Sequence, residues 1–226
     1  MTILYEDNHI IAVNKAVGEI VQPDKTGDAT LSDALKAYIK HKYNKPGNVF
    51  LGVAHRLDRP TTGVVLFART SKALARLNNM FRSHDRIQKT YWAIVQGRPA
   101  MPQAKLTNWL IRREQQNKSY IVKPGTHDAK EAILDYRTLA VGDNYSLLEI
   151  QLHTGRHHQI RCQLAAIGCP VKGDLKYGAR RSNPDGGISL HARKIEFVHP
   201  VSKQQVVIVA TPPDDNIWNA LTQSII

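Results

Sequence analysis

The order of apolar and polar residues along the chain predicts short β-strands interrupted by a few helices. Two apolar stretches, at residues 3–5 and 9–14, flank the polar triplet Glu6-Asp7-Asn8 and predict a β-hairpin. A continuous apolar run at 64–68 is typical of a strand that is buried on both faces. Further strands are predicted at 89–96, 120–123, 132–140, 146–151, 194–198 and 206–210.

Apolar residues three and four positions apart predict helices at 31–43, 71–84 and 158–167, with a terminal helix at 215–224. Thr30 and Ser32 are candidate N-caps of the first of these helices, and Gly168 is suited to end the third. Several strands follow one another without a regular helical crossover. The pattern therefore predicts an α+β fold, a mixed and largely antiparallel sheet with flanking helices, in a single domain over residues 1–226.

Composition narrows the class of protein further. The 226 residues contain no apolar run near the roughly 18 residues that span a bilayer, so we expect no membrane segment. The N-terminal stretch lacks the basic and apolar regions of a secretory signal. Two cysteines in a chain of this length are typical of a reducing compartment, which predicts a cytoplasmic protein. We take a monomer as the default oligomeric state.

Charge points to a polyanionic partner. Lysine and arginine total 31 against 19 aspartate and glutamate, a formal net charge of +12, which favours nucleic acid. Residues 153–194 hold eight lysines and arginines, four histidines and only two acids, so this stretch is the best candidate for a phosphate-binding surface. A solvated basic surface without a ligand is the alternative.

Asp58 is the most prominent candidate for chemistry. It lies in the segment His55-Arg56-Leu57-Asp58-Arg59-Pro60-Thr61-Thr62-Gly63, where the proline and the glycine predict a turn. Flanking cations favour an ionised carboxylate, which suits nucleophilic or base catalysis. Local chemistry alone favours a plainer role, in which Asp58 caps the turn or pairs with Arg56 or Arg59.

Several ordered motifs resemble those of the RluA-type RNA pseudouridine synthases. The segment at 55–63 resembles H-R-L-D followed by T-S-G, with Thr62 in place of the serine, and Asn14-Lys15 with Gly18 resembles N-K-P-x-G, with Ala16 in place of the proline. The other matches are Lys89-Thr90-Tyr91-Trp92-Ala93-Ile94-Val95-Gln96-Gly97, Leu152-His153-Thr154-Gly155-Arg156-His157-His158-Gln159-Ile160-Arg161, Gly168-Cys169-Pro170-Val171-Lys172-Gly173-Asp174, Tyr177-Gly178 and Leu190-His191-Ala192. The resemblance extends to about Pro200 and implies a catalytic domain of this fold, without the S4 RNA-binding domain that the family often carries.

The resemblance implies an isomerase that converts specific uridines of ribosomal or transfer RNA to pseudouridine, without cofactor or metal. It makes Asp58 the catalytic carboxylate, Arg161 the cation that keeps it ionised and oriented, and Tyr91 the ring against a uracil flipped out of its stack. Arg56 would enter the space left by the base or contact the RNA backbone. Candidates for phosphate contacts are Lys15, Arg156 and Lys172.

Three other interpretations are weaker. Cys162 and Cys169 with His157 and His158 do not have the spacing of a zinc site. A metal-dependent nuclease needs clustered carboxylates, and acids are scarce here. A non-catalytic basic RNA-binding module would explain the charge without chemistry.

Residues 108–130 are basic and look irregular, which predicts an insertion that determines RNA specificity.

Overall fold

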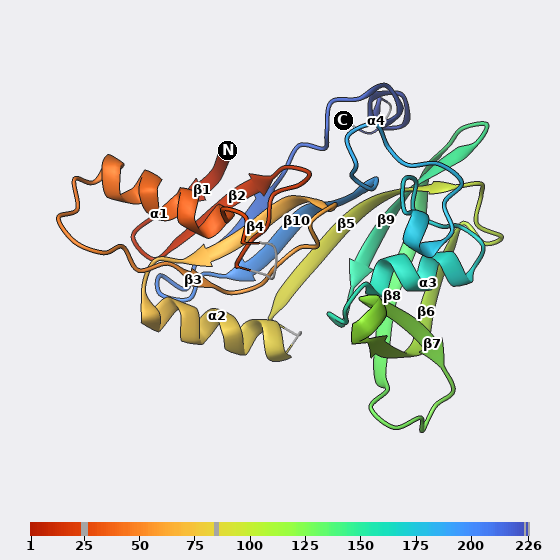
Figure 1. Cartoon of the computed structure of the whole chain (residues 1–226), viewed down its shortest axis with the longest axis horizontal. Helices are drawn as coiled ribbons and strands as arrows, with labels where there is room; N and C mark the ends of the chain where they lie inside the picture. Colours follow the sequence, from red (N-terminus) through yellow and green to blue (C-terminus); the bar gives the residue numbers. More distant parts are fainter. Residues whose placement is uncertain (24–26, 84–85, 224, 226) are drawn as a thin grey trace. The chain divides into compact units, whose positions relative to one another are not determined.

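The computed structural model describes residues 1–23, 27–83, 86–223 and 225 (Figure 1). Its contacts divide the chain into two compact units, each made of segments far apart in sequence. Unit 1 comprises Met1–Ile87 with Arg193–Thr211, and unit 2 comprises Gln88–Ala192 with Pro212–Ile226. The α+β class and the mostly antiparallel sheet are confirmed, and the single domain over residues 1–226 stays a prediction.

The strands of unit 1 surround one central, fully buried strand. β4 (Thr62–Ala68) is buried at every position, as its continuous apolar run predicts. The strand order in this unit is β1 (Thr2–Glu6), β2 (Ile10–Lys15), β4, β10 (Leu190–Val198) and β11 (Gln205–Val209), and the short β3 (Gly52–Val53) also pairs with β4. α2 (Ser71–Ser83) covers one face through Ala73, Leu77 and Met80. Residue 84 of the predicted helix lies outside the described residues.

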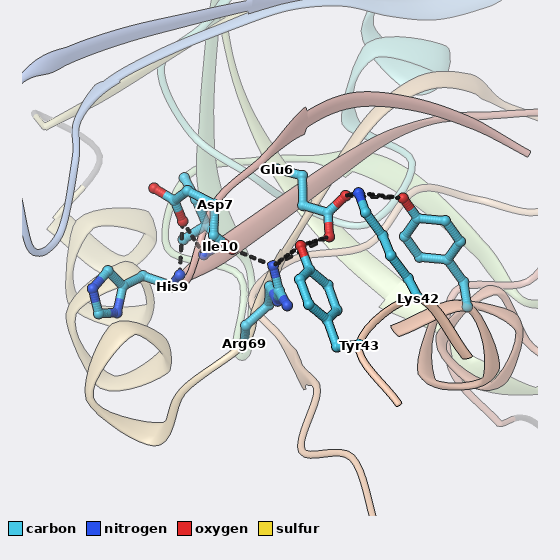
Figure 2. A network of polar contacts seen from close by, with 8 residues as sticks. Glu6, Asp7, His9, Ile10, Lys42, Tyr43 and Arg69 are labelled. Carbon is cyan, nitrogen blue, oxygen red and sulfur yellow. Dashed lines mark hydrogen bonds and ion pairs between the residues drawn. The ribbon is translucent and has the colours of Figure 1, made fainter. Parts of the chain in front are cut away.

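α1 (Leu31–Lys42) is held at both ends. Thr30 is its N-cap, with a reciprocal capping box to Asp33, so the first of the two candidate caps is confirmed. Near its other end, the Glu6 carboxylate accepts hydrogen bonds from Lys42 (2.7 Å), Tyr43 (2.9 Å), Arg69 (3.2 Å) and Tyr38 (2.9 Å) (Figure 2). Burial alone would raise the pKa of Glu6, but the hydrogen bonds from Lys42, Tyr43 and Tyr38 and the Lys42 charge outweigh it and lower the pKa.

Unit 2 is an antiparallel sheet with a helix on each face. The order is β5 (Ile87–Gln96), β9 (Tyr145–Leu152), β8 (Lys130–Val141), β6 (Gln103–Arg113) and β7 (Lys118–Val122). One face packs against α3 (Gln159–Ala166) and the other against α4 (Asn216–Thr222). Along β5, Tyr91, Ala93 and Val95 face the α3 side while Trp92 and Ile94 face α4, as the predicted alternation requires.

The expectation of an irregular segment at 108–130 is wrong. Its first part completes β6, and the chain then turns through the short helix η1 (Glu114–Gln116) and the left-handed Asn117 into β7. A second short helix, η2 (Leu175–Tyr177), follows α3. Most of this basic segment thus forms an ordered β-hairpin at the edge of the unit 2 sheet, and its role in RNA specificity stays a prediction.

Candidate functional site

The loop that carries Asp58 connects β3 to β4 in unit 1. The Thr61 amide donates to the Asp58 carbonyl at 3.0 Å, which closes the turn predicted around Pro60. His55 secures the start of the loop, because its Nε2 accepts from the Leu66 amide at 3.0 Å and its ring stacks on Phe81 with centroids 4.6 Å apart. The Asp58 side chain is half-buried on this fixed backbone.

Lys15 supports the same loop through hydrogen bonds to its carbonyl groups. Its side chain is 1% exposed, and Nζ donates to the carbonyls of Ala16 (3.0 Å), Arg59 (3.0 Å) and Thr61 (2.7 Å). Burial lowers the pKa of Lys15 to about 8, against the opposing effect of the Glu19 and Asp58 carboxylates. An ammonium that is enclosed and uses all three donors is a support of the Asp58 loop, so the expected phosphate contact at Lys15 does not fit this structure.

The segment that follows Lys15 also supports the Asp58 loop. The Gly18 amide donates to the Arg59 carbonyl at 3.1 Å from a left-handed backbone position, φ +82°. The Ala16 amide donates to the Glu19 carboxylate at 2.8 Å. A proline at position 16 has no amide hydrogen, so this bond exists because the chain departs from the family pattern there.

The arginines around Asp58 differ in their surroundings. Arg59 lies 2.8 Å from the Asp28 carboxylate in an exposed ion pair. Arg56 is exposed to solvent, and its contact with RNA stays a prediction. The acid at Arg59 in this contact is Asp28, and the alternative in which Asp58 pairs with Arg56 or Arg59 stays a prediction.

Arg161 forms a buried ion pair in unit 2. It lies in the first turn of α3 and is 5% exposed, and its partner Asp174 is 1% exposed. Nε lies 2.6 Å from Asp174 Oδ2 and Nη2 2.9 Å from Oδ1, a bidentate geometry that fixes the guanidinium plane. The guanidinium carbon lies 5.2 Å from the Tyr177 ring centroid. That Arg161 keeps the Asp58 carboxylate ionised and oriented stays a prediction.

Asp174 and Tyr177 are functional candidates that the sequence reasoning missed. Both belong to quoted motif segments, and a signal was available, since a buried arginine needs a carboxylate and residues 153–194 contain only two acids. Tyr177 in turn ties the β6–β7 hairpin to Arg161. Its hydroxyl accepts from the Ser119 amide at 2.8 Å and lies 3.0 Å from His158 Nδ1. Burial raises the pKa of Tyr177 well above its ordinary value.

The other predicted residues of unit 2 lie at or near its surface. Tyr91 is half-buried on the α3 face of β5, where a ring can be partly exposed and partly packed. Arg156 Nε donates to the Glu131 carbonyl at 2.8 Å, and Lys172 Nζ donates to Asn183 Oδ1 at 2.6 Å. Both remain candidates for RNA contacts. Lys89, in the Tyr91 motif, is buried, and this burial together with the Arg156 charge lowers its pKa to about 8.

Two further findings concern metal-binding clusters and membrane-spanning helices. Among the described residues, no group of three or more histidine, cysteine, aspartate and glutamate side chains is arranged to hold a metal ion. No helix in the described part of the chain is long and apolar enough to cross a membrane.

Comparison with known proteins assigns the family. Residues 9–166 match the family described as RNA pseudouridylate synthase. The chain is 34% identical to ribosomal large subunit pseudouridine synthase D of Zymomonas mobilis, over 95% of this chain and 70% of that protein. It is 31% identical to tRNA pseudouridine synthase C of Vibrio cholerae, over 98% of this chain and 94% of that protein.

The fold agrees with this assignment. The solved structure of human RNA pseudouridylate synthase domain containing 4 superposes with a TM-score of 0.80 and covers 98% of this chain and 92% of its own, at 24% identity. The family match and the two sequence relatives favour an enzyme over a non-catalytic RNA-binding module. The chain therefore belongs to the RNA pseudouridylate synthase family, isomerases that convert uridine in RNA to pseudouridine.

Proposed function

We propose that Asp58 is the catalytic carboxylate with which this chain isomerises uridines of ribosomal or transfer RNA. The observation that carries the proposal is the support of the Asp58 loop. Lys15 and Gly18 bind its carbonyls, Thr61 closes its turn, and a carboxylate on so fixed a backbone is held ready for reaction before substrate arrives.

The reaction needs a carboxylate and no outside reagent. The N1–C1′ bond breaks, the uracil turns, and a C5–C1′ bond forms, while C5 gives up its proton and N1 gains one. Positive character at C1′ is stabilised by a carboxylate, as in glycoside chemistry. Asp58 acts either by attacking C1′ or by removing a sugar proton. In both versions it must be ionised when the uridine binds.

Two further side chains complete the proposal. Tyr91 stacks on the uracil once it has been flipped out, a contact worth about 1–3 kcal/mol per base. Arg161 keeps the reacting carboxylate ionised and oriented. Its own orientation is set by the bidentate bond to Asp174, which makes Asp174 a positioning residue.

The nature of the RNA is supported by charge and by relatives. The net charge of +12 suits a polyanion, and two of the relatives are named for ribosomal and transfer RNA. We propose that the enzyme works in the cytoplasm, as a monomer and without a metal ion. Size-exclusion chromatography with light scattering and activity measured in EDTA test the last two points.

Tritium release tests the activity. RNA transcribed with [5-³H]uridine releases tritium to water only when C5 becomes bonded to C1′. We expect release by the purified chain, undiminished in EDTA. Pseudouridine mapping of ribosomal and transfer RNA from cells with and without the gene then identifies the uridine. RNA binding without tritium release from any cellular RNA fraction would favour the non-catalytic module instead.

A further inference from the structure

A polar cavity lies wholly within unit 2, at the end of β5. Its volume is about 640 Å³. It is lined by Gln96, Gly97, Asp143, Asn144, Tyr145, Gly168, Pro170, Gly178, Arg180 and Arg181. Gln96 is five residues beyond Tyr91 on β5, which at about 3.3 Å per residue places it roughly 16 Å away. The cavity is therefore distinct from the position of Tyr91.

The charge of this cavity favours an anion. Arg180 and Arg181 are exposed, and within the described ranges neither side chain is paired with a carboxylate. Lys172 adds a third cation, because its Nζ lies 5.9 Å from the ring centroid of Tyr145, which lines the cavity. Asp143 is the acid in the lining, so the two lining arginines outnumber it, and Lys172 lies close by. Unpaired arginines beside a hollow suit the bidentate binding of phosphate.

The shape of the cavity suits a nucleotide. Tyr145 is half-buried and presents a ring on which an unpaired base can stack. Gly97 and Gly178 leave the wall open, since a β-carbon at either position would meet nothing within 4 Å. The left-handed backbone at both, φ +73° and +98°, favours glycine there. A basic rim, an aromatic ring and an open wall together match single-stranded RNA.

We propose that this cavity binds a stretch of the substrate RNA outside the modified nucleotide. Arg180, Arg181 and Lys172 contact its phosphates, and Tyr145 stacks on one unpaired base. The inference rests on RNA being the substrate, which the proposed function states. It gives residues 168–181 a role in choosing the RNA that is separate from the chemistry at Asp58.

Fluorescence anisotropy with a labelled, unmodified transcript of ribosomal RNA tests the inference, whether or not a modified uridine has been mapped. We expect the double variant Arg180→Ala/Arg181→Ala to bind about tenfold more weakly near 0.1 M salt. The slope of log K against log salt should fall by about 1.4, because each lost phosphate contact with a single strand removes about 0.7. The matched control, Lys72→Ala/Arg82→Ala, removes two exposed cations on α2.

Three single variants separate phosphate binding from stacking. Asp143→Asn should tighten binding, since it removes the carboxylate from the lining. Tyr145→Leu should weaken binding about tenfold while Tyr145→Phe preserves it, because only the aromatic ring is needed. Thermal denaturation of each variant checks that it is folded.

The inference is overturned if the arginine pair changes affinity and salt slope no more than the control pair does. It is also overturned if an acidic peptide, and not the transcript, depends on Arg180 and Arg181. Failure of the proposed function would look different, because the chain would then bind the transcript through this cavity and release no tritium.

Discussion

Substitution of Asp174 by asparagine tests whether the Arg161 ion pair is a structural and functional unit. Asparagine preserves the size of the side chain and one oxygen acceptor but removes the charge. The guanidinium of Arg161, 5% exposed, would lose its carboxylate partner at 2.6 and 2.9 Å. Removing one member of a buried pair costs about 3–5 kcal/mol, because the other charge stays buried without compensation.

The expected loss is large relative to the stability of a folded domain, about 5–15 kcal/mol. In a chain of this size it lowers the melting temperature by roughly 6–20 °C. Circular dichroism during thermal and urea unfolding measures this loss. Tritium release at a temperature where both proteins are folded measures the effect on turnover, which should fall as Arg161 loses its fixed orientation. The control is Asp185→Asn, an exposed acid of the same segment.

A double substitution makes the test sharper. Arg161→Met/Asp174→Leu removes both charges, so it should destabilise the protein less than Asp174→Asn alone does. A melting temperature for Asp174→Asn equal to that of the Asp185→Asn control would refute the reasoning. So would a double variant that is less stable than the single one.

Three other substitutions probe the remaining polar contacts. Glu6→Gln removes the charge that Lys42 and Arg69 share, and we expect a loss of about 1–3 kcal/mol with lower amide-exchange protection in α1; unchanged protection would contradict this. Lys15→Met removes the ammonium donor from the carbonyls of Arg59 and Thr61, so turnover should fall at least tenfold while RNA affinity changes little; a loss of affinity alone would point to a phosphate contact at Lys15 instead. Lys89→Met tests the pKa of about 8. Between pH 8 and 10.5 the unfolded chain holds a proton that Lys89 has released in the folded protein. The free energy of unfolding of the wild type should therefore rise with pH relative to that of the variant, by at most about 3 kcal/mol. A difference that does not change with pH would refute the shift.

Local patterns in the sequence predicted most of the fold. The unbroken apolar run of β4 and the alternation along β5 each depend on neighbouring residues alone, and both were read correctly. β6 was missed although Ala104, Leu106 and Leu110 alternate with polar residues. Its lysine and arginines obscured a strand that lies next to the edge of the sheet.

Long-range partners were beyond a reading of the sequence. Lys15 looked like a surface lysine, and only its approach to the carbonyls of Arg59 and Thr61, more than 40 residues away, makes it a support. For Arg161 the sequence limits the nearby acids to Asp174 and Asp185, but the packing of α3 determines that Asp174 is the partner. The division into two units arises because Arg193–Thr211 returns to the N-terminal strands, which no local pattern records.

The central claim, that Asp58 performs the chemistry, is tested most directly by tritium release from [5-³H]uridine RNA under single-turnover conditions with Asp58→Asn. The substitution is isosteric, so the half-buried side chain can keep its place while losing the carboxylate. We predict that release falls by more than about 10²-fold, with unchanged RNA affinity and melting temperature, whereas the exposed control Asp128→Asn remains fully active. Release by a folded Asp58→Asn protein at the wild-type rate would contradict the account.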